Sequence, residues 1–433
     1  MRFAFLITFL LVVVLFANAQ SERLTLPDAV SRSLEHNYDI KVIAVLAQEA
    51  GTRNTIGNAG LLPSINGNGG LNLSSANTHM EFADGRLQNV SGAQTLSYNA
   101  GVSANYTLFA AGRAWMIRSQ LKATDQLAQI QLRQQMQATI SQTIQTYSNA
   151  VWQQQQRAAT DTALALAKAR MLLTQMQYET GLSAKVDFLQ ARVDYNARQS
   201  DSLALMNNLN AAFSDLNFLM GADPFNSYQV DDSLTLNTHL TPSDPSRLAN
   251  SNLSIDIAKR NLELAHLGER ISRTNLLPSL GVNVGYNYSH SQSQAGFALF
   301  NRSFGPSGGL NLNIPIYQGG TLQTQLKVAG LEAKRQELLL DRQHTDISRQ
   351  YRTIWKAYQL AVSAYHLEQE NIHFAKENLL IQEARFRAGI ATTIETREAE
   401  NSYVQALNRL FSAAYNLKIN ETKVLELESK LDN

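Results

Sequence analysis

The chain has 433 residues, with 37 lysine and arginine residues against 36 aspartate and glutamate residues, and no cysteine. Because only 17% of the residues are charged and the two signs balance, the composition argues against a protein that captures nucleic acid electrostatically. The lack of cysteine excludes disulfides, thiolate metal sites, a cysteine nucleophile and lipidation of a cysteine after an export signal.

Residues 1–19 have the pattern of a secretory signal peptide. Arg2 precedes an apolar run from Phe3 to Ala17, and small residues occupy the positions −3 and −1 before Gln20. We therefore expect an exported protein whose mature chain carries 36 residues of each charge, since cleavage removes Arg2. No later stretch approaches the ~20 apolar residues of a transmembrane helix, so we expect strands to carry any membrane insertion.

The remaining sequence uses one plan twice. Asn37 corresponds to Asn252 at an offset of 215, and Gly181 corresponds to Gly389 at an offset of 208. Such self-similarity indicates two related halves. The first half is longer by seven residues before its long helix, and residues 80–86 are expected to form a loop there.

Each predicted repeat consists of a helix, two strands, a very long helix and a return helix. The first repeat spans 20–220, with a helix about 27–60, strands about 64–76 and 94–109, a long helix 112–180 and a return helix 183–219. Residues 221–242 form a proline-containing linker. The second repeat spans 243–428, with a helix about 243–277, strands about 279–291 and 307–317, a long helix 320–388, a return helix 391–428 and a tail at 429–433.

The two long helices are predicted from uninterrupted stretches. The 68 residues between Gly112 and Gly181 contain neither glycine nor proline, and the 68 between Gly320 and Gly389 contain only Gly330. At ~1.5 Å per residue, each helix would be roughly 100 Å long, which is far beyond the length usual in globular proteins. Apolar residues recur in them at alternating spacings of four and three, as in coiled coils.

All four predicted strands alternate between an apolar face and a face of Asn, Ser, Gly or Thr. A soluble β-sandwich would also alternate, but four strands in two distant hairpins are few for a sandwich, whereas strands of about ten residues suit a tilted crossing of a bilayer. We therefore expect lipid on the apolar face. The candidate lipid-facing residues are Leu96, Tyr98, Val102, Tyr106, Val282, Val284, Tyr286, Leu310, Leu312 and Ile314.

Four strands cannot close a barrel, because the smallest membrane barrels have about eight strands. A barrel would therefore have to be shared between subunits. Two chains would supply eight strands and three would supply twelve, and the strand count does not choose between them.

Three motifs occur in the same order in both halves. The first is Leu-Leu-Pro-Ser before each hairpin, at 61–64 and 276–279. The second is a strand-to-helix turn, made by Leu108, Phe109 and Gly112 in the first half and by Ile316, Tyr317, Gly319 and Gly320 in the second. The third is an aromatic-x-x-Gly turn followed by an acid and an alanine. With these motifs, the chain resembles the TolC-type outer-membrane efflux proteins over essentially its whole mature length.

The resemblance implies a mostly α-helical fold with a membrane β-barrel portion. Three chains would close a twelve-stranded barrel on an α-helical barrel, in the outer membrane of a Gram-negative bacterium, with a long periplasmic extension. The glycine turns after the long helices would contact a periplasmic adaptor protein, itself bound to an inner-membrane pump of the RND, ABC or MFS type.

Site residues follow from the resemblance position by position. The adaptor-contact residues would be Tyr178, Gly181, Leu182, Phe386, Gly389 and Ile390, and the acids of the tunnel entrance would be Asp187, Glu395 and Glu398. The family pattern has Asp at both entrance positions of the second half and a basic residue where Ala391 stands. From the residues alone, the glycines are also ordinary helix C-caps, and the acids also complement helix dipoles.

No pattern of catalytic residues is present. The sequence has no Walker loop, no Gly-x-Ser-x-Gly and no His-Glu-x-x-His, so we expect no enzyme activity, no cofactor and no metal site. The expected function is a passive exit duct of a tripartite efflux or type I secretion system. The alternative is a secreted or envelope-associated long-helix scaffold or adhesin without channel activity. The sequence does not discriminate between drug, metal and protein as cargo.

Overall fold

The computed structural model describes residues 22–244, 248, 251–296 and 298–431, so the predicted signal peptide lies outside the described residues. The chain forms two units. The helical unit comprises the described parts of Met1–Val45, Ile130–Asp256 and Arg342–Asn433, and the strand unit comprises Leu46–Gln129 and Ile257–Asp341.

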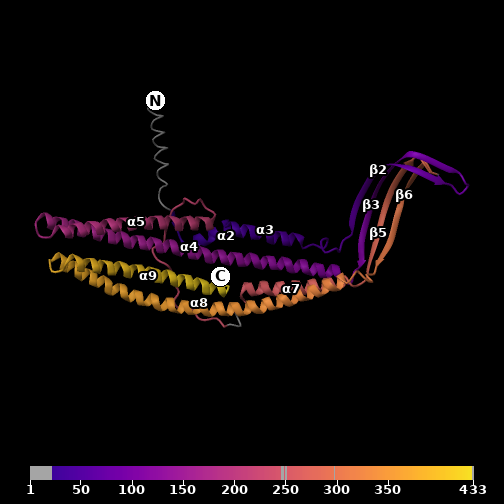
Figure 1. Cartoon of the computed structure of the whole chain (residues 1–433). Helices are drawn as coiled ribbons and strands as arrows, with labels where there is room; N and C mark the ends of the chain where they lie inside the picture. The colour runs from indigo at the N-terminus through magenta and orange to yellow at the C-terminus, as the bar shows by residue number, and fades with distance from the viewer. Residues whose placement is uncertain (1–21, 245–247, 249–250, 297, 432–433) are drawn as a thin grey trace, which may run out of the picture. The chain divides into compact units, whose positions relative to one another are not determined.

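The helical unit is built from long antiparallel helices. It holds β1 (Glu22–Leu24), α2 (Leu26–His36), α5 (Lys185–Met220), β4 (Tyr228–Val230) and α9 (Thr393–Leu427), with parts of α3 (Tyr38–Arg53), α4 (Arg113–Glu179), α7 (Leu253–Thr274) and α8 (Thr321–Arg387). In this unit α5 returns along α4 and α9 returns along α8 (Figure 1). Helices α4 and α8 have 67 residues each, and their ends lie within one residue of the predicted ends.

The helix predicted over 27–60 is broken in two. The break is at Asn37, whose side-chain oxygen accepts the N–H groups of Asp39 and Ile40 at 2.9 and 3.2 Å and so caps α3. Its side-chain nitrogen donates to the carbonyl of Leu219 in the last turn of α5, at 3.0 Å. A polar side chain that satisfies both helix ends explains why this asparagine is buried.

Asn252 makes the same connections in the second half of the chain. It caps α7 by accepting the N–H groups of Ser254 and Ile255, and it donates to the carbonyl of Leu427 at the end of α9. The helix predicted from residue 243 is therefore interrupted at Asn252: Leu248 and Ser251 before it are helical, and α7 begins at Leu253. Asn37 and Asn252, which correspond at an offset of 215 in the sequence, therefore have the same structural role in the two halves.

The segment predicted as an irregular linker, 221–242, contains a short strand. Tyr228 and Val230 of β4 are buried on one face, and β4 pairs in parallel with β1. The hydroxyl of Tyr147 on α4 donates to the carbonyl of Leu24 and accepts the N–H of Asp231, which fastens both strands to the helix. Burial raises the pKa of Tyr147 to about 12. Three-residue strands are too short to show an alternation in the sequence.

A buried charge cluster joins three helices of the helical unit. Arg170 of α4, only 5% exposed, forms ion pairs with Asp194 of α5 at 3.0 Å and with Glu400 of α9. Burial raises the pKa of the Glu400 carboxyl even though Arg170 opposes that shift. Arg170 serves both carboxylates, but Asp194 also pairs with Arg397 at 3.8 Å. Of the two acids, Glu400 is therefore the one whose ion pairing depends on Arg170.

The described residues contain neither a membrane-spanning helix nor a metal-binding cluster. None of the described helices carries an apolar stretch long enough to cross a bilayer. No three acidic or histidine side chains in the described part of the chain are grouped so that they could hold a metal ion.

Replacing Asn37 should destabilise the helical unit through two contacts. We expect Asn37→Ala to lower the free energy of unfolding by about 2–3 kcal/mol, because it removes a cap and leaves the Leu219 carbonyl unpaired. Asn37→Asp keeps the capping oxygen and should cost less. Thr25→Ala, which removes only the exposed cap of α2, should cost about 1 kcal/mol. Thermal unfolding followed by circular dichroism measures all three, and equal losses for Asn37→Ala and Thr25→Ala would contradict the bridging role.

Replacing Arg170 should cost more than replacing Glu400. We expect Arg170→Gln to cost about 3–5 kcal/mol at neutral pH, because the buried Glu400 carboxylate loses its cation while Asp194 keeps only its longer pair with Arg397. Glu400→Gln should cost about 1 kcal/mol, since Arg170 keeps Asp194.

The pH dependence of these two variants separates them further. Glu400 holds its proton more tightly in the folded than in the unfolded chain, so stability falls as the pH rises from the unfolded pKa through the raised folded pKa. The deficit of Arg170→Gln should therefore shrink on acidification, as Glu400 takes up a proton. A deficit that is the same at pH 5 and pH 7 in thermal unfolding would show that the charges are not its cause.

Candidate functional site

The four long strands form one antiparallel sheet in the strand unit, in the order β2 (Ser64–Glu81), β3 (Leu87–Phe109), β5 (Ser279–Ser293) and β6 (Phe300–Asn313) (Figure 1). Two hairpins that are far apart in sequence are joined by the pairing of β3 with β5. The outer strands β2 and β6 each pair on one side only within the described chain. Their free edges are rows of backbone donors and acceptors open to another strand.

The register brings the apolar residues of all four strands onto one face. We call a set of residues paired across the strands a rung. Rungs on the apolar face include Gly67–Val102–Tyr286–Pro306 and Gly69–Ala100–Tyr288–Phe304. Val102 is 55% exposed and most other large apolar side chains on this face are exposed too, so the described chain does not cover the face. The predicted lipid-facing residues Tyr106 and Val282 are half-buried and pair with each other.

The opposite face is made of asparagine, serine and glycine. Asparagine side chains lie over glycines of the neighbouring strand: Asn99 over Gly70, Asn287 over Gly101 and Asn283 beside Gly309. A Cβ at Gly70 or Gly101 would meet the asparagine side chain, which explains glycine inside these strands. The result is an uncharged polar surface.

Both ends of this sheet differ from the predicted strands. A β-bulge at Leu108 places Phe109, rather than Leu108, opposite Leu280 on the apolar face. Strand β6 ends at Asn313 instead of residue 317, because Pro315 has no N–H for the ladder, so Ile314 lies beyond the strand. At the far end, β2 continues beyond its predicted end at residue 76 and ends at Glu81. Strand β3 begins at Leu87, before its predicted start at residue 94.

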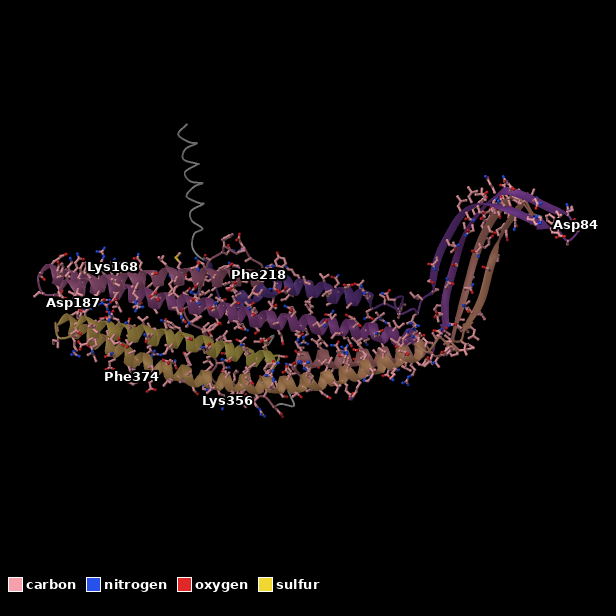
Figure 2. All side chains as sticks on the ribbon, viewed as in Figure 1. Asp84, Lys168, Asp187, Phe218, Lys356 and Phe374 are labelled. Carbon is pink, nitrogen blue, oxygen red and sulfur yellow. The ribbon has the colours of Figure 1, made fainter. Side chains whose placement is uncertain are left out.

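The predicted loop at 80–86 is therefore only a turn. It is closed by the N–H of Phe82 donating to the carbonyl of Arg86, and Arg86 pairs with Asp84 at 2.7 Å. Figure 2 shows Asp84 at the far end of this hairpin. Both strands are longer than predicted because the residues up to Glu81 on β2 pair with residues from Leu87 onward on β3.

The predicted strand-to-helix turns have matching backbones. Gly319 and Gly320 have φ values of 61° and 78°, and their counterparts Ala111 and Gly112 have 50° and 76°. Two successive residues in the left-handed region connect each strand to its long helix, which explains the glycines of this motif. Ile316 and Tyr317 are exposed in the second turn, as are Leu108 and Phe109 in the first.

The predicted adaptor-contact turns also share one geometry. The N–H of Leu182 donates to the carbonyl of Gln177 at 2.7 Å, and that of Gly181 donates to Tyr178 at 3.0 Å. Ile390 and Gly389 make the equivalent bonds to Arg385 and Phe386. With φ values of 78° and 72° at the two glycines, both turns are Schellman caps.

Each of these turns presents a pair of exposed aliphatic side chains. Leu182 and Val186 are 81% and 67% exposed, and Ile390 and Ile394 are 70% and 69% exposed. The two residues of each pair are four positions apart, and the two pairs correspond at an offset of 208. Val186 and Ile394 were not predicted, although the spacing of four after each predicted residue was a usable signal. In the first turn Tyr178 also stacks on Phe188.

The three predicted entrance acids are in different environments. Asp187 lies in the first turn of α5, near the end of the helical unit (Figure 2). Glu395 belongs to a capping box: it accepts the Thr392 N–H at 2.7 Å while its own N–H donates to the Thr392 hydroxyl. The bond from Thr392 lowers the pKa of the Glu395 carboxyl. Glu398 is exposed and has no ion-pair partner among the described residues.

Comparisons with known proteins agree with this arrangement. The family model "Outer membrane efflux protein" matches residues 29–222 and 245–427. Outer membrane protein TolC of Salmonella enteritidis is 23% identical over 262 residues, covering 58% of this chain and 52% of the relative, so the match spans about half of that relative. Cation efflux system protein CusC of Escherichia coli is 23% identical over 398 residues, covering 90% of this chain and 83% of the relative.

A solved structure has the same fold. The CmeC outer membrane channel of Campylobacter jejuni superimposes with a TM-score of 0.79 at 18% identity, covering 94% of this chain and 85% of that chain. Since the family model matches well over half of the sequence, the protein belongs to the outer membrane efflux protein family, whose members are channels of the Gram-negative outer membrane rather than enzymes.

Proposed function

We propose that the protein is a passive exit duct in the outer membrane, serving a tripartite efflux or type I secretion system. The observation that carries this function is the four-stranded sheet, with one exposed apolar face, one uncharged polar face and two unpaired edges. In a bilayer each unpaired backbone group costs several kcal/mol, so the edges must pair with other strands. Strands of another copy are the simplest partners.

In this proposal three copies form the twelve-stranded barrel that the resemblance to the family implies. Twelve strands, four from each chain, would close when β6 of one subunit pairs with β2 of the next. The apolar face would then meet lipid, and the Asn, Ser and Gly face would line a water-filled pore. An uncharged lining favours passage without selective binding, which suits a duct whose cargo is chosen elsewhere.

The helical unit would form the periplasmic tunnel and its entrance. In this proposal the Schellman turns at Gly181 and Gly389 contact a periplasmic adaptor protein, and the aliphatic pairs beside them bury apolar surface against it. The adaptor would connect the duct to an inner-membrane pump of the RND, ABC or MFS type. Relatives named for cation efflux and for protease secretion support this class of system and leave the cargo open.

A charge on the apolar face of the sheet should block assembly. Val102 lies in the middle of that face, and we expect Val102→Lys to cost about 2–4 kcal/mol in each subunit, because the lysine faces hydrocarbon. Ser103→Lys places the same charge on the opposite face and serves as the matched control. It should still form trimers, with fewer cations carried through the pore.

The measurements are the mass of the detergent-extracted oligomer and single-channel conductance in a planar bilayer. Wild type and Ser103→Lys should give trimers that conduct ions, and Val102→Lys should give neither. A monomeric wild type without conductance would refute the duct. Equal assembly of the two lysine variants would refute the assignment of the faces.

Among the acids of the second turn, Glu398 should control ion selectivity more than Glu395. Three-fold symmetry would bring three Glu398 carboxylates together, and such a ring favours cations. Glu398→Gln should therefore shift the reversal potential in a salt gradient toward that of an unselective pore. Glu395→Gln should change the reversal potential less and instead lower helix stability by about 1 kcal/mol, because it weakens the capping box. A larger selectivity change in Glu395→Gln would reverse this assignment.

A further inference from the structure

The apolar face of the sheet carries one group of polar and aromatic side chains that lipid tails do not explain. It lies on the rung Leu71–Tyr98–His290–Arg302 and on the rungs next to it. Arg302 is the only arginine or lysine in the four strands, all of which are described in full. A lone cation on a lipid-facing surface needs a physical reason.

Aromatic rings hold this cation and the neighbouring imidazole in place. The Arg302 guanidinium lies 5.5 Å from the Tyr288 ring centre and 5.9 Å from that of Phe304. His290, directly opposite Arg302 on β5, stacks on Tyr98 at 4.5 Å and meets the edge of Phe300 at 4.8 Å. Both rings are within cation–π distance of Arg302, which forms no ion pair with a carboxylate among the described residues.

No acid of the sheet is placed to neutralise Arg302. None of β3, β5 and β6 contains an acidic residue, and the single acid of β2, Glu81, comes ten residues after Leu71 of this rung. Asp84 in the adjoining turn is paired with Arg86. In the proposed barrel, β6 pairs with β2 of the next copy. The single acid which that strand could bring to Arg302 is Glu81, at the end of β2.

The level of this group along the strands is informative. His290 comes ten residues after Leu280, which begins the apolar face of β5, and ten residues of strand span about 34 Å. At the tilt of 35–45° usual in membrane barrels, that is a height of about 24–28 Å. The apolar band of such barrels is about 25 Å tall, so Arg302 and His290 would lie where hydrocarbon gives way to headgroups.

We propose that Arg302, held by Tyr288 and Phe304 and assisted by His290, binds the phosphate of an anionic lipid headgroup in the outer leaflet around the barrel. The site rests on the proposed insertion of the sheet in the membrane. The planar guanidinium presents two parallel N–H donors to phosphate oxygens, and the imidazole opposite adds another donor. The aromatic rings beside them suit the boundary level, where their apolar bodies meet acyl chains.

The bound lipid would also act on assembly. Arg302 lies on β6, which is an edge of the four-stranded sheet, so a lipid held there lies beside the seam between neighbouring subunits of the proposed trimer. Three such sites would bind three anionic lipids per barrel. No other rung of the apolar face offers a cationic side chain for this purpose.

Native mass spectrometry of the full-length protein from nanodiscs tests the site. Nanodiscs of phosphatidylcholine containing a minor fraction of phosphatidylglycerol supply the anionic probe, and the lipids that stay bound to the trimer are counted. We expect up to three retained phosphatidylglycerol molecules per trimer for wild type and about tenfold weaker retention for Arg302→Gln, corresponding to the loss of a charge-assisted pair. Arg302→Lys should be intermediate, because it keeps the charge without the fork.

Arg86→Gln is the matched control. It removes the same charge from the hairpin turn, where Arg86 is already paired with Asp84, and it should leave lipid retention unchanged. Excess inorganic phosphate should not displace the retained lipid, since the acyl chains contribute to its binding. Displacement by inorganic phosphate would mean that the site binds free phosphate, and the lipid site would be abandoned.

The remaining outcomes separate this site from the duct itself. If the trimer enters nanodiscs and Arg302→Gln retains phosphatidylglycerol as wild type does, the lipid site is wrong and the duct stands. If wild type does not enter nanodiscs as an oligomer, both proposals fail.

Discussion

The unpaired edges of the four-stranded sheet are the constraint on which the rest of the structure depends. Strands β2 and β6 each leave a row of backbone donors and acceptors without a partner in the described chain. Water could satisfy those groups, but water would also meet the exposed apolar face, including Val102 and Tyr286. In the proposed duct, pairing with other copies inside a membrane satisfies both the edges and the face. The proposed oligomer would then be part of how this chain reaches a stable fold.

The register of the sheet turns four separate sequence patterns into two continuous faces. A shift of one residue between β3 and β5 would move apolar side chains to the polar face, so the pairing of Ala100 with Tyr288 is strongly determined. The Asn–Gly neighbours on the other face add a second restraint. Asn287 lies over Gly101 in this register, and a residue with a Cβ at that position would force the asparagine side chain to move. Both faces therefore favour one alignment.

Much of this arrangement could be predicted from the sequence because it follows from strict periodicity. Alternation located the strands and the apolar residues, and the glycine spacing located both long helices. What could not be predicted depends on contacts between distant segments. The break at Asn37 exists because its side chain reaches Leu219, and the strand at Tyr228–Val230 exists because it pairs with β1. The bulge at Leu108 is likewise a property of two paired strands and not of one.

Assigning roles by position has a further physical limit, which the two glycine turns illustrate. Their backbones match, but α9 begins with the capping box of Thr392 and Glu395, whereas α5 begins at Ala184 without a side-chain cap. The carboxylate of Glu395 is thus already engaged in local hydrogen bonds, while that of Glu398 is free of ion pairs among the described residues. A carboxylate that stabilises its own helix is fixed in direction and has less freedom to respond to an ion. Two acids that correspond equally well to a family pattern can therefore differ in function, and the difference is visible only in which of them has a partner.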